Sequence, residues 1–196
     1  MKSDLDWRTS GGPLVFNSIY TSEHYDARLE QPGWSAPGFD DSAWGGVMYR
    51  GAPSQRVTAQ QTVPIRNVTQ YRPRSVRKLD ERSYLYDFGQ NMAGVTKLRL
   101  RGEAGTQLRL IHAERLREDG HADLSNIDVY FRPTDKDDLF QTDVVTLSGR
   151  DDEFMPRFNY KGFRYVEVVA DRPVELSAEN LTAYAMHSDV TPVGHI

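Results

Sequence analysis

Apolar and polar residues alternate with a period of two along most of this chain, as they do in β-strands that bury one face. Sustained helical periodicity is hard to find. Between Thr96 and Arg101 one face carries apolar side chains and the other carries lysine and arginine, and a second alternating run follows the turn at residues 102–105. Further strands are expected at residues 14–20, 83–87, 143–147, 163–170 and 181–187. The pattern predicts an all-β fold, an antiparallel β-sandwich or jelly roll.

The first third of the chain has a different character. Residues 31–44 are punctuated by Pro and Gly, and Asp40 or Asp41 is placed to cap one short helical turn. Residues 45–65 resemble a connector, so we expect two parts, residues 1–65 and residues 66–196. The first part supplies about two strands, which cannot bury an apolar face alone. It must pack on the second part or pair with sequence upstream of residue 1.

Composition narrows the class of protein. A chain of 196 residues with 38% hydrophobic and 27% charged residues is of ordinary globular size and can form one or two cores. The net charge of −4 argues against a nucleic-acid partner. Basic residues do gather between Arg66 and Arg82, but Pro and apolar residues interrupt them, which favours an exposed sheet edge.

Targeting and redox signals are few. No stretch approaches the roughly 18 to 20 apolar residues that cross a bilayer, so no membrane partner is expected. The first residues lack the apolar run of a signal peptide, and the sequence leaves the compartment open between cytoplasmic and exported. The absence of cysteine excludes disulfides and thiolate nucleophiles.

A series of short motifs carries a specific resemblance. Residues 86–94 read Tyr-Asp-Phe-Gly-Gln-Asn-Met-Ala-Gly, and the run from Glu23 to Arg28 reads Glu-His-Tyr-Asp-Ala-Arg. With His112-Ala113-Glu114, Pro156-Arg157-Phe158 and Gly162-Phe163-Arg164-Tyr165, they make a chain that resembles the bacterial α-L-rhamnosidases of glycoside hydrolase family 78. Ser22 and His24 depart from the family's Gly-Glu-Thr-Tyr-Asp-Ala-Arg run, so a loop that needs glycine at position 22 is in doubt.

The resemblance implies an arrangement of domains. Residues 1–65 would end an N-terminal sugar-binding-like β-sandwich, and residues 66–196 would form a second, concanavalin-like β-sandwich upstream of an (α/α)6 catalytic barrel. The parent enzymes hydrolyse terminal α-L-rhamnose by an inverting mechanism whose acids belong to that barrel. We therefore expect a truncated gene product or expressed fragment that supports the barrel without catalysis. Its expected partners are a rhamnose-containing carbohydrate, the barrel, the upstream sandwich and, through exposed apolar surface, a second copy.

Candidate site residues each have a structural and a functional interpretation. Glycoside hydrolysis needs two carboxyl groups, and Asp87, Glu114 and Asp143 are candidates, but no catalytic residue is assigned. His112 and Glu114 share a strand face with leucines, which predicts a buried hydrogen-bonded pair or a contact with the barrel or a sugar. Asp87, Gln90 and Asn91 follow a strand, where they either build a turn or face the barrel.

The sequence also contains residues that could bind a sugar or a metal ion. Exposed rings stack on sugars, and the candidates are Trp34, Trp44, Tyr25 and Tyr160, which alternatively cover the end of the sandwich. The acidic runs at residues 40–41, 135–138 and 151–153 supply oxygens that calcium prefers, although none has a recognised loop spacing. We expect no required cofactor, with calcium as an open alternative. A free-standing carbohydrate-binding module is the second candidate function, and a hydrolase active in isolation is the third.

Overall fold

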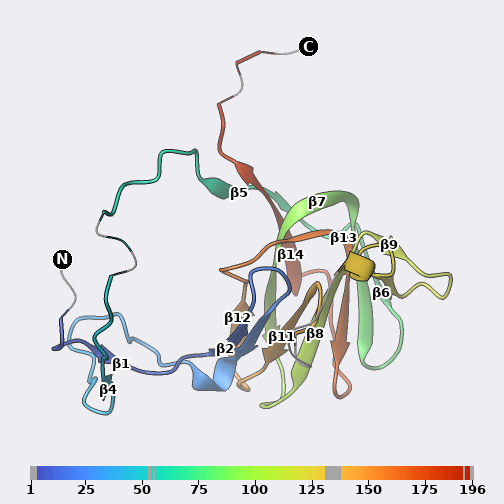
Figure 1. The fold of residues 1–196 in the computed structure, drawn as a ribbon. Helices are drawn as coiled ribbons and strands as arrows, with labels where there is room; N and C mark the ends of the chain where they lie inside the picture. The colour runs from blue at the N-terminus through green and yellow to red at the C-terminus, as the bar shows by residue number, and fades with distance from the viewer. Residues whose placement is uncertain (1–3, 53, 55, 131–137, 192, 195–196) are drawn as a thin grey trace.

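The computed structural model describes residues 4–52, 54, 56–130, 138–191 and 193–194, in which almost every regular element is a β-strand (Figure 1). One large curled sheet has the strand order β2-β3-β11-β8-β13-β7-β14-β5, and β12 and β6 also pair with β7. Its strands are β2 (Leu14–Asn17), β3 (Glu23–Asp26), β5 (Ile65–Tyr71), β6 (Ser75–Lys78), β7 (Ser83–Arg101), β8 (Gln107–Ala113), β11 (Thr142–Thr146), β12 (Asp151–Phe154), β13 (Lys161–Ala170) and β14 (Leu181–Ser188).

The minor elements lie outside this sheet. Two short ribbons pair β1 (Arg8–Thr9) with β4 (Gly45–Gly46) and β9 (Arg115–Leu116) with β10 (Ala122–Asp123). The helical turns are η1 (Ala27–Leu29) and η2 (Asp128–Tyr130). None of the helices in the described part of the chain is long and apolar enough to span a membrane. The expected all-β fold class is confirmed.

A single hydrophobic core lies inside the curled sheet. Alternate residues of the central strands point into it, because successive side chains of a strand face opposite sides. The fully or almost fully buried members include Tyr86, Leu98, Leu108, Leu110, Phe163, Val166, Val168 and Leu181. The period of two in the sequence therefore identifies the core correctly.

The long strand β7 corrects one expectation. Residues 83–87 and 96–101 were expected as separate strands, but they belong to one strand of 19 residues. Met92 pairs with Phe163 and Asp87 with Tyr165, so residues 88–91 bulge out opposite the single residue Arg164. Gly89 in this bulge has φ 83°, a conformation that glycine adopts without strain. The polar, glycine-containing motif is thus a bulge within a strand and not a turn after one.

A strand that the alternation does not predict begins with acidic residues. Residues 151–153, an acidic run considered above only for calcium binding, begin β12, which pairs antiparallel with Leu98–Arg101 of β7. Glu153 forms ion pairs with Lys97 (2.6 Å) and Arg99 (2.7 Å) of that neighbour. Opposite charges across two strands make this pairing favourable despite low β-propensity.

Part of residues 1–65 joins the large sheet. Strand β3 pairs in parallel with β11, and β2 pairs antiparallel with β3, so the sheet is not purely antiparallel. Asp26 caps η1 by accepting from the N–H of Arg28. Asp40 accepts from the N–H of Ser42 in a turn, where a helical turn was expected. The division near residue 65 stays a prediction.

Gly94 offers a test of this packing. It pairs with Lys161 of β13 on one side and with Ala185 of β14 on the other. A Cβ at this position would overlap the Tyr184 carbonyl oxygen and lie 3.2 Å from Ala185 Cα. We expect Gly94→Ala to lower the free energy of unfolding by about 1–3 kcal/mol, measured by urea denaturation.

The matched control is Gly46→Ala, because a Cβ at Gly46 in β4 meets no atom within 4 Å. The two substitutions add the same methyl group to a strand glycine. Equal stability of the two variants would contradict the steric role assigned to Gly94.

Candidate functional site

A buried cluster of charges lies at the start of β13. Lys161 at the start of β13 is 4% exposed, and its Nζ donates to Asp143 Oδ1 (2.7 Å) and Asn159 Oδ1 (2.6 Å). Asp143 Oδ1 also accepts from the backbone N–H of Glu23 (2.9 Å). Among the described residues no group hydrogen-bonds to Asp143 Oδ2, which is buried. Removing either charge would leave the other buried without its partner.

The side chain of Glu23 forms hydrogen bonds with the backbone of the loop that precedes β13. Its Oε1 accepts from the backbone N–H groups of Arg157 (2.9 Å) and Phe158 (2.6 Å) and from Asn159 Nδ2 (3.4 Å). Desolvation raises the pKa of Glu23 above its ordinary value, although the two backbone N–H groups act in the opposite direction. Glu23 is only 2% exposed, so this carboxyl group cannot reach a substrate.

His112 in β8 is entirely buried. Its Nδ1 lies 2.9 Å from the Leu110 carbonyl oxygen, so that nitrogen carries the proton, and Nε2 accepts from Thr96 Oγ1 (2.9 Å). The ring edge packs on Phe163 at 4.9 Å between centroids. Burial lowers the pKa of His112 to about 4, so the imidazole is neutral near pH 7. The side chain has no surface with which to contact a sugar or another domain.

The β7 bulge is fixed by a bidentate ion pair. Arg164 of β13 donates to both carboxylate oxygens of Asp87, at 2.9 Å each, and Asp87 Oδ1 accepts from the Gly89 N–H (2.7 Å). The hydrogen bonds from Arg164 hold the pKa of Asp87 below its usual range. Gln90 beside them is exposed and donates to the Tyr71 hydroxyl (2.9 Å).

Glu114 accepts hydrogen bonds from two side-chain amides at the same region of the surface. It accepts from Asn91 Nδ2 (3.0 Å) in the bulge and from Asn126 Nδ2 (3.3 Å) in the segment before η2. It does not pair with His112, as the expected buried pair would require. Gln90, Asn91 and Glu114 therefore keep polar surface at the bulge, whereas Asp87 is engaged by Arg164.

Of the four aromatic candidates, Trp44 and Tyr25 contact neighbouring side chains, whereas Trp34 and Tyr160 are exposed. Trp44 donates through Nε1 to Gln31 Oε1 (2.9 Å) and packs beside Phe39, so it holds its own loop together. Trp34 in the same loop is 60% exposed. Tyr25 donates its hydroxyl to Glu30 and stacks near Phe154, while Tyr160 is exposed.

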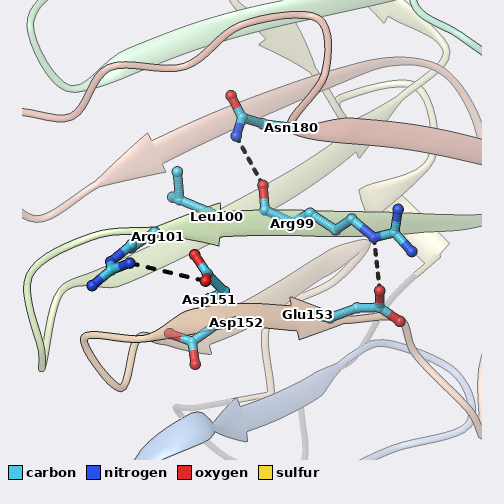
Figure 2. A pocket seen from close by; sticks show the side chains of 7 residues that line it. All are labelled: Arg99, Leu100, Arg101, Asp151, Asp152, Glu153 and Asn180. Carbon is cyan, nitrogen blue, oxygen red and sulfur yellow. Dashed lines mark hydrogen bonds and ion pairs between the residues drawn. The ribbon is translucent and has the colours of Figure 1, made fainter.

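A shallow hollow of about 300 Å³ lies between β7, β12 and the loop before β14 (Figure 2). Leu100 contributes an apolar side chain, and the remaining lining residues are charged or amide side chains. Glu153 binds Arg99, Asp151 lies 4.0 Å from Arg101, and Asp152 accepts from Ser148. Hydrogen bonds from Lys97 and Arg99 lower the pKa of Glu153, so it is no proton donor near pH 7.

Glycoside hydrolysis needs a protonated carboxyl group and an ionised one on opposite sides of the scissile bond, and three of the carboxyl groups described above do not supply this pair. Glu23 has a raised pKa but is sealed in the interior, and Glu153 and Asp87 are held ionised by cations. In the described ranges no three His, Asp or Glu side chains lie close enough to hold a metal ion. Three residues of the acidic run 135–138 fall outside the described residues.

Sequence reasoning missed Glu23 and Lys161 as parts of one cluster. A usable signal existed for Lys161, because it shares a strand face with Phe163, two residues away, and a charge on a buried face needs a partner. No comparable signal identifies Asp143 as that partner, 18 residues earlier, or joins Glu23 to Phe158, 135 residues later.

Comparison with known proteins agrees with these observations. The family described as bacterial alpha-L-rhamnosidase concanavalin-like domain matches residues 77–187, and the alpha-L-rhamnosidase N-terminal domain matches residues 1–69. A curated α-L-rhamnosidase of Streptomyces avermitilis is 39% identical over 190 residues, covering 95% of this chain and 17% of its own length. One of Formosa agariphila is 32% identical over 197 residues, covering 98% of this chain and 20% of its own length.

Solved structures give the same result. The α-L-rhamnosidase of Dictyoglumus thermophilum superposes with a TM-score of 0.82 at 35% identity, covering 95% of this chain and 20% of that protein. The Streptomyces avermitilis enzyme complexed with L-rhamnose also gives 0.82, at 38% identity, covering 95% and 17%. This chain therefore spans about a fifth of the length of the relatives it matches.

The buried ion pair predicts a large effect of one substitution. Lys161→Met keeps the approximate volume of the side chain but leaves the buried Asp143 without its cation. We expect the free energy of unfolding to fall by about 3–5 kcal/mol, measured by urea denaturation. The control is Lys78→Met, which breaks an exposed ion pair with Glu175 and should leave stability almost unchanged. Similar losses of unfolding free energy in both variants would show that the buried Lys161–Asp143 pair contributes no more to stability than an exposed ion pair.

His112 predicts a pH dependence. Its pKa falls from 6.5 to about 4 on folding, so below pH 6.5 the unfolded chain binds a proton that the folded chain does not. Stability is therefore lost as pH falls through this window. Relative to His112→Gln, the wild-type free energy of unfolding should decrease by about 3 kcal/mol between pH 7 and pH 4.

Denaturation curves at several pH values test this, and the difference between the two proteins cancels the opposite contribution of Glu23, whose raised pKa favours stability at lower pH. A constant difference across the range would contradict the assignment of a neutral buried imidazole.

Proposed function

Because this chain belongs to the bacterial α-L-rhamnosidase family, we propose that it is an accessory β-sandwich region of such an enzyme, and that hydrolysis of terminal α-L-rhamnose takes place in another part of the polypeptide. The region supports the catalytic part and does not itself carry the catalytic acids. Its matched relatives, of which it spans 17–20%, are long enough to contain a separate catalytic domain.

One observation carries the proposal: three carboxylates of this region, two of them in the family motifs, are engaged by other groups of the protein. Asp87 holds Arg164, Glu23 holds the backbone of Arg157 and Phe158, and Asp143 holds Lys161. A catalytic carboxyl group must be open to substrate and free to change its protonation state, and these groups are not. Groups paired in this way stiffen the sheet, which is what a supporting region requires.

The bulge in β7 is the proposed place of contact with the catalytic part. Gln90 and Asn91 are exposed there, and the half-buried Glu114 accepts a hydrogen bond from Asn91. Trp34 is a separate exposed candidate in the N-terminal part. Asp87, Trp44 and His112 have structural roles in this proposal, since each is engaged or buried by its immediate neighbours.

A carbohydrate-binding module is the second candidate. The exposed ring of Trp34, 60% accessible, supports it, because such rings stack on the apolar faces of sugars. Calcium remains part of this alternative as a bridging ion. The exposed apolar residues of the N-terminal part, among them Tyr20, Met48, Tyr49 and Val57, also favour self-association of the isolated chain.

Two measurements on the isolated chain test the proposal. We expect no hydrolysis of a chromogenic α-L-rhamnoside, since the carboxylates of Asp87, Glu23 and Asp143 are engaged by other groups of the protein. We also expect no saturable heat on calorimetric titration with millimolar L-rhamnose, with calcium or with chelator, and glucose serves as the control sugar.

Each contrary result has a distinct meaning. Rhamnose-selective heat would establish the binding module, and its loss in chelator would identify a calcium-bridged site. Hydrolysis that disappears in Glu114→Ala would overturn the accessory role.

A further inference from the structure

Two segments present large apolar side chains at one end of the sheet. The turn between β2 and β3 carries Ile19, 63% exposed, and Tyr20, 82% exposed. The loop before β13 carries Phe158 and Tyr160, 56% and 55% exposed. In Figure 1 these are the blue turn after β2 and the orange loop that leads into β13. With Arg157 they form what we call the end patch.

Glu23 brings the two segments together. It follows the β2–β3 turn directly, and its carboxylate accepts from the N–H groups of Arg157 and Phe158 in the other loop. The turn is closed by its own backbone, since Ser18 and Ser22 are joined by an N–H···O bond of 3.0 Å. The end patch is therefore assembled on a fixed backbone.

The direction of its side chains is also fixed. Asn159 and Lys161 point inward, 7% and 4% exposed, and are joined by a hydrogen bond of 2.6 Å. Phe158 and Tyr160, the residues on either side of Asn159, point outward, as their exposure shows. A loop whose backbone is fixed before a contact forms loses little freedom when it does form, which favours binding.

We propose that the end patch is a docking surface for the rest of the α-L-rhamnosidase polypeptide, an inference that rests on the proposed accessory function. In the matched relatives this region makes up 17–20% of the chain, so most of the polypeptide lies outside it and needs a surface to pack against. Phe, Tyr and Arg are enriched at the centres of protein interfaces. The matching surface should be apolar, with an acidic or carbonyl group opposite Arg157.

The chemistry of the end patch favours protein over sugar. A sugar site needs polar groups that converge on the ligand around an aromatic ring. Here the neighbouring polar side chains of Glu23, Asn159 and Lys161 are buried and are linked to one another by hydrogen bonds through Asn159. Ile19 and Phe158 bring no polar side-chain atoms, so the polar groups of the end patch are the two tyrosine hydroxyls and the Arg157 guanidinium. The surface is thus suited to exclude water over an apolar contact.

A hybrid enzyme tests the inference. Residues 1–196 replace the matching region of the Streptomyces avermitilis α-L-rhamnosidase, to which they are 39% identical. We expect Phe158→Ala with Tyr160→Ala to lower the Tm of the hybrid by about 4 °C or more. The same double substitution should leave the Tm of the isolated chain unchanged, because both rings are exposed there. Met48→Ala with Tyr49→Ala, also exposed and outside the end patch, is the matched control.

The outcomes separate the two proposals. An active hybrid whose Tm is indifferent to the double substitution would overturn the docking surface and leave the accessory function standing. Rhamnoside hydrolysis by the isolated chain would instead overturn the accessory function. Rhamnose binding that is lost in the double variant of the isolated chain would make the end patch a sugar site and overturn the docking role.

Should the hybrid not fold, a second measurement decides. This chain superposes on the Streptomyces avermitilis structure with a TM-score of 0.82. The side chains that align with Phe158 and Tyr160 should be covered there by polypeptide outside the matched region. Exposure of both to solvent would overturn the inference.

Discussion

The ion pair between Lys161 and Asp143 is the interaction on which this end of the structure depends. Both side chains are almost completely buried, at 3% and 0% exposure, so each charge has lost its hydration. That loss costs several kcal/mol per ion and is offset only by close geometry and further hydrogen bonds. Asn159 and the N–H of Glu23 supply these bonds, and in doing so they join β13, β11 and the start of β3 at one point.

The residues of the family motifs thus have structural roles that can be described without any role in catalysis. Asp87 and Arg164 belong to different motifs and form one bidentate pair across the β7 bulge. Glu23 and Phe158 likewise come from two motifs and meet through one carboxylate. Gly94, at the end of the longest motif, lets β7 approach the Tyr184 carbonyl. Residue types that suggest catalysis in a sequence here fix the positions of strands and loops.

The alternation of apolar residues predicts the all-β fold and most of the core, because burial on one face leaves its period in the sequence. It misjudges β7, since Gly89 and its polar neighbours resemble a turn when they are a bulge. It misses β12, where three acidic residues are stabilised by cations on the adjacent strand. The alternation also does not predict which residues of the site contact one another. Glu23 and Phe158 are 135 residues apart, and only the folded chain brings them together.

A buried ion pair is a costly way to gain stability, because apolar residues of similar volume often serve as well or better. Here the ion pair specifies the register of the segment that enters β13. A slip of one residue in the segment that enters β13 would turn Lys161 outward and bring Phe158 and Tyr160 inward, since side chains alternate with a period of two. Apolar rings tolerate either side, but Lys161 finds Asp143 on one side only. The charge cluster therefore decides which face of the loop the rings occupy, and with it the surface that the region presents to the rest of the enzyme.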